Sequence, residues 1–352
     1  MYITTMSSPY TASGMGWVIN CFLELNILCY RNQLKDDTWE RFELPAGYRK
    51  KGYTPYSLTK LEHLLQPHLP TLMRRQQFLF RDDVLVHWGH DYPDKNHPID
   101  KVILVVRDPR DAMLSIYNRP SKPWSCSFRE YIEWIDYATF LSKIDDWIFF
   151  NQCWLQFPNV HIVRFEEYKN DPKQTLQNIL DFCELEYPEA MLDKALCNST
   201  SEKSKLAEKK YYQMNPSIQQ TYTANGPSKV NRFEACTDLS DTMEDIYRRT
   251  SSTMKSLGYC IEDIPPPNNQ PNFTDYCLYE SNNPFLENLP EFIIAKAIEG
   301  KKSPSGFALL HAALARFIDS EVWHSEENGG QYYKYWMSNP EGIRRILDSG
   351  LL

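Results

Sequence analysis

Short runs of β-branched and apolar residues alternate with longer helical patterns along the first 260 or so residues of this chain. Parallel strands need crossover connections of this kind, which are usually helices, whereas antiparallel hairpins do not. The alternation therefore predicts an α/β fold with a central parallel sheet flanked by helices. The predicted strands are YITTM (2–6), VLVHW (84–88), KVILVV (101–106) and VHIVRF (160–165).

Three helical segments are marked clearly in the sequence. After the last predicted strand, Asp171 can cap a helix whose first turn holds Pro172. A second helix is predicted from about Leu239 to Leu257, with Gly258 as its stop. The stretch WVINCFLELNILCY (17–30) is interpreted as one core helix, because its apolar run is interrupted by polar residues and is too short to span a bilayer.

The stretch IPPPNNQPN (264–272) favours neither helix nor strand and is predicted to be a linker. It separates an α/β domain (1–263) from a C-terminal helical extension (273–352), whose helical patterns end in a segment that starts at Asn339-Pro340. Three roles stay open for the extension: a cap over an acceptor pocket, a homodimer contact, or a cover for the sheet edge.

Composition excludes several classes of function. The net charge of −8 argues against binding to nucleic acid or to anionic membranes, which favour a basic face. The nine cysteines form no C-x-x-C pair, so neither a disulfide framework nor a zinc site is expected. The first residues show no basic and then apolar leader pattern, and we therefore expect a cytoplasmic protein.

The stretch SSPYTASGMGW (7–17) places small residues between a predicted strand and a predicted helix. Such a loop can turn its backbone N–H groups inward and hold a phosphate at the helix N-terminus. It lacks the Lys and Ser/Thr of the nucleoside triphosphatase pattern G-x-x-x-x-G-K-[ST]. An ordinary tight turn of an α/β fold is the alternative interpretation.

A second motif, KVILVVRDPRDAMLSIYN (101–118), supports a phosphate site. A buried strand leads to Arg107, Asp108-Pro109 breaks it, and the next helix carries Ser115. A guanidinium at a strand end and a hydroxyl on the following helix can converge on one phosphate, with the arginine giving a bidentate contact. The sequence thus predicts two phosphate sites on neighbouring parts of one sheet.

With these two motifs the chain resembles the cytosolic-type sulfotransferases, which use 3′-phosphoadenosine 5′-phosphosulfate (PAPS). In that family a loop like P-K-S-G-T-T-W holds the 5′-phosphosulfate, and R-[ND]-P-[KR]-D-x-x-x-S holds the 3′-phosphate. The resemblance covers roughly residues 1–260. It implies a P-loop-like sheet, PAPS as co-substrate with adenosine 3′,5′-bisphosphate (PAP) as product, no metal, and transfer of a sulfuryl group to a hydroxyl or amine of a small molecule.

The resemblance also implies which residues bind the nucleotide. An aromatic residue at the start of Y-E-D-x-x-x-D-P packs near adenine in the family, and FEEYKNDP (165–172) matches that pattern here. GPSKVNRF (226–233) resembles the late loop that closes over the 3′-phosphate, although a solvated basic turn is an open alternative. The implied nucleotide-binding residues are Thr11, Ala12, Ser13, Gly14, Met15, Gly16, Trp17, Arg107, Ser115, Phe165, Lys229 and Arg232.

A base must take the proton of the acceptor, and histidine suits that role near neutral pH. The family places this histidine in a stretch like K-x-H-x-P, and VLVHWGHDYP (84–93) offers His87 and His90. The interpretation favours His87, because it directly continues the predicted strand. A hydrogen-bonded structural histidine is the alternative, and a metal site would need further ligands.

The chain departs from the family pattern at two positions. Ala12 stands where the family has a Lys or Arg that steadies the leaving group, and Leu85 stands where a second Lys is common. Loss of such a contact can cost about a hundredfold in rate. Backbone N–H groups from Gly14 to Trp17 could take over this role, or another cation could. The candidate cations are Arg31, Lys35, Arg49, Lys50, Lys51 and Arg81.

These departures leave two other functions open. A sulfotransferase homologue that binds the nucleotide without transfer would act as a sensor or scaffold. A P-loop small-molecule kinase is less consistent with the loop, because the Lys and the magnesium-binding Ser/Thr are missing.

Segments 36–56 and 118–150, where the family builds its acceptor pocket, are rich in aromatic and acidic residues. Such a pocket can hold a cation. The phrase SPYTASGMGW resembles bacterial and cyanobacterial sulfotransferases of specialised metabolism, which suggests a saxitoxin-type guanidinium alkaloid as acceptor. We expect helix-core positions for Trp134, Tyr137, Phe140 and Trp147, and surface positions for Asp36, Asp37, Asp145 and Asp146.

Overall fold

A computed structural model of the chain describes residues 1–8, 12–30, 69–75, 78–90, 99–119, 126–133, 142–216 and 230–261. The predicted linker (264–272) and extension (273–352) lie outside these residues. The described helices are α1 (Met15–Glu24), α4 (Pro70–Arg74), α5 (Pro109–Tyr117), α6 (Phe128–Glu133), α7 (Lys143–Leu155), α8 (Phe165–Asn170), α9 (Pro172–Phe182), α10 (Glu189–Asn198), α11 (Ser201–Met214) and α12 (Ser240–Ser256), with 3₁₀ turns η2 (Arg232–Ala235) and η3 (Thr237–Leu239).

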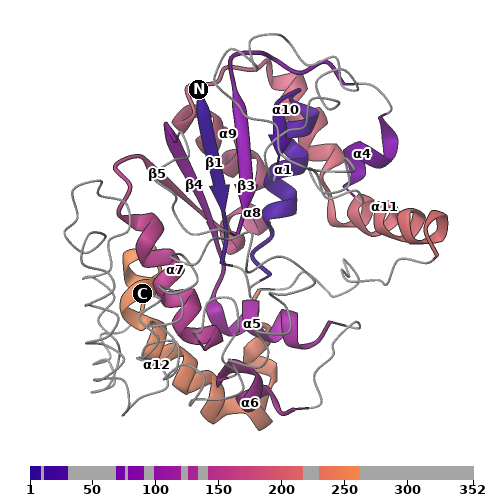
Figure 1. Cartoon of the computed structure of the whole chain (residues 1–352). Helices are drawn as coiled ribbons and strands as arrows, with labels where there is room; N and C mark the ends of the chain where they lie inside the picture. The colour runs from indigo at the N-terminus through magenta and orange to yellow at the C-terminus, as the bar shows by residue number, and fades with distance from the viewer. Residues whose placement is uncertain are drawn as a thin grey trace, which may run out of the picture.

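Parallel strands form the centre of the described fold, which confirms the predicted α/β class (Figure 1). Their order in the sheet is β2-β3-β1-β4-β5. Because all neighbours are parallel, the carboxyl ends of the strands share one edge, where α5 follows β4 and α8 follows β5. The strands are β1 (Tyr2–Met6), β2 (Leu28–Tyr30), β3 (Leu85–Gly89), β4 (Lys101–Val106) and β5 (Val160–Arg164).

Alternate side chains of β4 enter two different cores. Val102 and Leu104 pack with α5, α6, α7 and α12, while Ile103 and Val105 pack with α1, α9 and α10. All four side chains are fully buried. Helices therefore cover both faces of the sheet, as the long apolar run of this strand predicts.

Two of the predicted helix boundaries rest on local capping chemistry. Asp108 precedes Pro109 and its carboxylate accepts the Arg110 N–H at 2.9 Å, which starts α5. Asp171 precedes Pro172 in the same way and starts α9. These caps satisfy N–H groups that the first helical turn leaves open. Both predicted helix starts are confirmed.

The prediction of one helix over 17–30 was wrong. α1 ends at Glu24, Asn26 adopts a left-handed conformation with φ of 59°, and Leu28–Tyr30 forms β2 beside β3. Asparagine tolerates this conformation better than most residues, so the chain can turn there. The apolar residues after the turn then serve as a short buried strand.

The prediction of surface positions for Asp145 and Asp146 was also wrong. The two residues are 5% and 0% exposed in the first turn of α7. Asp145 accepts the Ser142 hydroxyl at 2.8 Å and pairs with Arg249 at 3.1 Å. Trp147 is buried as predicted. Trp134, Tyr137, Phe140, Asp36 and Asp37 lie outside the described residues.

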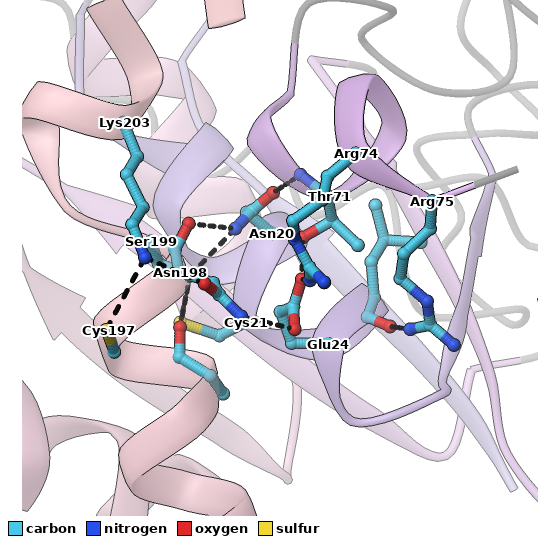
Figure 2. Close-up of polar contacts among 12 residues, drawn as sticks. Asn20, Cys21, Glu24, Thr71, Arg74, Arg75, Cys197, Asn198, Ser199 and Lys203 are labelled. Carbon is cyan, nitrogen blue, oxygen red and sulfur yellow. Dashed lines mark hydrogen bonds and ion pairs between the residues drawn. The ribbon is translucent and has the colours of Figure 1, made fainter. Parts of the chain in front are cut away.

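Polar side chains of α1 join it to α4 and to the end of α10 (Figure 2). The Asn20 Oδ1 atom accepts the Thr71 N–H at 3.0 Å, and its Nδ2 donates to the Ser199 hydroxyl at 2.8 Å. Asn20 is 1% exposed. One buried amide thus fixes three segments that are far apart in sequence.

Glu24, one turn further along α1, is the acidic centre of this contact (Figure 2). Its carboxylate accepts hydrogen bonds from the Thr71 hydroxyl, from Arg74 and, at 2.9 Å, from Asn198. Burial alone would raise the pKa of Glu24, but the hydrogen bonds from Thr71, Asn198 and Arg74 bring it below its usual value. The buried charge is therefore well compensated by the protein itself.

Candidate nucleotide site

The loop after β1 turns into α1 through Gly14. This residue is the N-cap, with a left-handed φ of 85°, and the Trp17 N–H donates to its carbonyl at 2.9 Å. A Cβ at this position would lie 2.0 Å from the Tyr168 hydroxyl oxygen and 3.0 Å from a ring carbon of Phe165. Glycine is thus required both by the backbone conformation and by the rings of α8. Of the predicted N–H donors, the one on Trp17 is already used within the helix.

Arg107 follows β4 and joins the predicted motifs. It is 3% exposed, and its Nη1 atom donates to the Ala12 carbonyl at 3.2 Å. The guanidinium carbon lies 4.2 Å from the centre of the Phe165 ring. Residues 12, 107 and 165 were predicted from three separate motifs, and the structure brings them together.

Asp111 connects Arg107 to the late segment of the chain. One of its carboxylate oxygens lies 3.3 Å from Arg107 Nη2, and the other accepts the Phe233 N–H at 3.1 Å. The neighbouring Arg110 guanidinium lies 3.8 Å from the Phe233 ring centre. Arg232, adjacent to Phe233, therefore belongs to a turn that is fixed to α5, whereas Lys229 and Thr11 lie outside the described residues.

The sequence analysis missed Tyr168 at this site. Its ring stacks on Trp17 with centroids 4.6 Å apart and an angle of 6°, and it meets Phe165 edge to face. Burial raises its pKa. The available signal was its position three residues after Phe165, because residues at that spacing share one face of a helix. The loop glycine, Trp17 and two rings of α8 thus form one contiguous surface.

The two candidate bases lie in different surroundings. His87 pairs with Thr4 inside the sheet, and its ring centre is 5.2 Å from that of Tyr30. His90 comes directly after the carboxyl end of β3, and its Nδ1 lies 2.8 Å from the Ser7 carbonyl oxygen. Ser7 itself begins the loop after β1. His90, rather than His87, is therefore at the sheet edge where the predicted phosphate loop starts.

The remaining predicted nucleotide-binding residues lie on the same two helices or the loop before them. Ser13 and Met15 are buried, whereas Gly16 and Ser115 are half-buried. Ser115 lies in α5, eight residues after Arg107 in sequence, as predicted.

Of the candidate cations that could replace the missing loop lysine, only Arg81 lies within the described residues. Arg81 precedes the amino end of β3, where it pairs with Asp83 and donates to the Tyr187 hydroxyl at 2.8 Å. Leu85 is the first residue of β3, so neither residue is at the carboxyl edge. Among the described cations, Arg107 is the one that contacts Ala12. The other candidates, Arg31, Lys35, Arg49, Lys50 and Lys51, lie outside the described residues.

Within the described ranges, no group of three His, Cys, Asp or Glu side chains is arranged to hold a metal ion. No described helix is long and apolar enough to span a bilayer. A small hollow of about 160 Å³ lies between α4 and α11. It is lined by Pro70, Met73, Arg74, Asn198, Lys203, Leu206 and Ala207, none of which is a predicted site residue.

Solved structures that are similar to the chain include a sulfotransferase and a retinol dehydratase. One is mouse sulfotransferase SULT7A1 complexed with PAP, with 13% identity over 73% of this chain and 87% of the other, at a TM-score of 0.43. The other is retinol dehydratase in complex with androsterone and PAP, with 14% identity over 76% of this chain and 83% of the other, also at a TM-score of 0.43. No curated protein matches the sequence.

The sulfotransferase domain family matches residues 96–256. This segment runs from just before β4 to the end of α12, and it contains Arg107, Ser115, Phe165 and Arg232. The residues predicted to bind the 3′-phosphate and adenine therefore fall within the matched segment, whereas the loop predicted to hold the 5′-phosphosulfate lies outside it. Over residues 96–256, which make up somewhat less than half of the chain, the chain is similar to sulfotransferase domains.

Proposed function

We propose that this protein transfers the sulfuryl group of PAPS to a hydroxyl or amine of a small-molecule acceptor, and that the residues around Arg107 bind the nucleotide. The observation that carries the proposal is the position of Arg107, which contacts the Ala12 carbonyl, the Phe165 ring and Asp111 at once. A buried guanidinium that joins a glycine loop to an aromatic ring suits a nucleotide with two phosphate groups.

The contact between Arg107 and the Ala12 carbonyl also concerns the lysine that this loop lacks. Residue 12 has only a methyl side chain, yet Arg107 places a positive charge next to its backbone. A cation held there by the fold can stabilise negative charge as the sulfuryl group leaves, because it needs no reorganisation during the reaction. This supports transfer over mere nucleotide binding, which remains the second candidate because of Ala12.

We propose His90 as the base. A carbonyl oxygen only accepts hydrogen bonds, so the 2.8 Å contact with the Ser7 carbonyl, which is shorter than the 3.3 Å contact of the same nitrogen with the Ser7 hydroxyl, favours the tautomer with the proton on His90 Nδ1. The other ring nitrogen, Nε2, then carries the lone pair that can take the proton of the acceptor. His87 packs beside Tyr30 within the sheet.

The acceptor is specified only as a small molecule. The predicted pocket segment 36–56 lies outside the described residues, as does part of 118–150. Asp145 and Asp146, two of the acids in that second segment, are buried, and Asp145 pairs with Arg249. These two acids therefore give no support to a guanidinium acceptor, and we do not propose one.

Calorimetric titration with PAP, without added metal, tests the nucleotide site. We expect micromolar binding by the wild type and a loss of about 2 kcal/mol, roughly thirtyfold, in Arg107→Ala. Arg81→Ala is the matched control, since this arginine lies at the other end of β3 and should leave the affinity unchanged. Absence of binding by the folded wild type would overturn the proposal.

Turnover with PAPS and a panel of hydroxyl and amine acceptors tests the base. We expect His90→Ala to lower kcat by at least a hundredfold while the affinity for PAP stays the same. His87→Ala is the matched variant, with a much smaller loss in kcat. Absence of turnover by the folded wild type with every acceptor would favour the nucleotide sensor. Equal kcat in all three proteins would show that neither histidine is the base, and a loss confined to His87→Ala would transfer the role to that residue.

A further inference from the structure

Glu166 lies in the first turn of α8 and contacts two segments that are far from it in sequence. One oxygen of its carboxylate accepts the Asp108 N–H at 3.1 Å, and the other accepts the Tyr259 hydroxyl at 3.1 Å. Asp108 is the N-cap of α5, and Tyr259 follows α12. The carboxylate therefore joins the point where the chain leaves β4 for α5 to the segment after α12.

The hydrogen bond from the Asp108 N–H constrains the residue before it. This N–H belongs to the planar peptide group that also carries the Arg107 carbonyl, so holding it fixes the rotation of the backbone after the Arg107 Cα. The Arg107 side chain lies 4.2 Å from the centre of the Phe165 ring. Phe165 and Glu166, two consecutive residues of α8, thus contact the side chain of Arg107 and the peptide group that follows it.

The charge of Glu166 argues against a direct contact with a nucleotide. A carboxylate repels phosphate groups, and both of its oxygens already accept hydrogen bonds from the protein. Burial raises the pKa of Glu166, whereas the hydrogen bonds from the Asp108 N–H and the Tyr259 hydroxyl oppose this rise. The contacts of the side chain therefore suit a role that is exerted through the neighbouring backbone.

We propose that Glu166 is a positioning residue of the nucleotide site, which holds the peptide group after Arg107 so that the guanidinium is oriented before the ligand binds. The inference rests on the proposed function and deepens it, because it assigns a residue that acts on the nucleotide only through Arg107. Orientation in advance raises affinity, since less conformational freedom is lost on binding. The effect of Glu166 should therefore disappear when the Arg107 side chain is absent.

Calorimetric titration of the full chain with PAP tests this role. We expect Glu166→Ala to weaken PAP binding about tenfold. Glu166→Gln should stay within twofold of the wild type, because its amide oxygen can accept the Asp108 N–H while its amide nitrogen donates to the Tyr259 oxygen. Glu167→Ala is the matched control, since this neighbouring acid of α8 pairs with Arg164, and its removal should change the affinity less than twofold.

A double-mutant cycle distinguishes positioning of Arg107 from general support of α8. In an Arg107→Ala background, we expect Glu166→Ala to lower the affinity for PAP less than twofold further. A further tenfold loss in that background would overturn the proposal, because Glu166 would then act without Arg107. Equal losses in the single variants Glu166→Ala and Glu167→Ala would overturn it as well, because any acid of this turn would then have the same effect.

A shorter acid keeps the test decisive if Glu166→Ala does not fold. Glu166→Asp retains the charge but cannot reach both partners, and we expect it to weaken PAP binding at least threefold. Unchanged affinity in the folded variant would overturn the role of Glu166, while PAP binding by the wild type and its loss in Arg107→Ala would still support the proposed function. If the folded wild type binds no PAP, both proposals fail.

Discussion

The two ends of α1 use buried charge in different ways. Near its C-terminal end, Glu24 receives hydrogen bonds from side chains of α4 and α10, so the protein itself supplies every group that the carboxylate needs. Near its N-terminal end, the buried Arg107 lies against the Phe165 ring of α8, pairs with Asp111 and donates to the carbonyl of Ala12 in the loop before α1. The first arrangement holds helices together, whereas we propose that the second forms part of a nucleotide site.

The largest effect on stability is expected from removing the buried carboxylate of Glu24. Glu24→Ala should lower the free energy of unfolding by about 3 kcal/mol, because it removes the buried acid and leaves its hydrogen-bond donors unpaired. Urea denaturation measures the loss, and the affinity for PAP of the folded protein should stay within twofold. The control is Glu189→Ala, which removes an exposed ion pair and should cost less than about 0.5 kcal/mol. A loss of nucleotide affinity in Glu24→Ala would contradict the proposed division of roles.

An intermediate effect is expected at the N-terminal end of α1, where Gly14 is the N-cap. Gly14→Ala should cost about 2 kcal/mol of stability and at least tenfold in affinity for PAP, because alanine is strained at a φ of 85° and its Cβ would overlap Tyr168. Gly258→Ala is a matched control, since Gly258 has a φ of 79° but faces the end of the Arg164 side chain. It should lose stability without losing affinity. Similar affinity losses in both variants would show that the effect at Gly14 is global.

The smallest effect concerns pH and the stability that Glu24 provides. Because the pKa of Glu24 is lower in the folded protein than in the unfolded chain, its contribution is complete above the unfolded value of about 4.3 and decreases as the pH falls through the folded value. The stability difference between wild type and Glu24→Gln should therefore shrink below about pH 4. Urea midpoints at several pH values measure it. A difference that grows toward acid pH would show that the pKa is raised instead.

Local chemistry explains which parts of the fold were predictable. β4 and the start of α5 follow from an apolar run ended by Asp108-Pro109, and both signals lie within a few residues of the structure that they specify. β2 was missed because its three residues continue the apolar pattern of α1, and the turn at Asn26 has no Gly or Pro to mark it. The pattern of apolar residues alone does not distinguish a short buried strand from a helix extension.

At the candidate site and in its surroundings, contacts between residues far apart in the sequence were also not predicted. Arg107 and Phe165 were found because each stands in a motif, but Asp145 was placed on the surface because its partner, Arg249, lies 104 residues away in sequence. Tyr168 was overlooked although it shares a helix with Phe165. Its contact with Trp17 forms only through the tertiary fold.

The hydrogen bond from the Phe233 N–H to Asp111 has a consequence for the order in which the protein is made. A ribosome releases the loop after β1 first, Arg107 and Asp111 next, and the turn around Phe233 more than a hundred residues later. A growing chain that ends before this turn holds Arg107 and Phe165 but lacks the segment whose Phe233 N–H donates to Asp111 of α5. The turn can therefore be fixed to α5 only at the last stage of cotranslational folding, after nearly all of the α/β domain has left the ribosome.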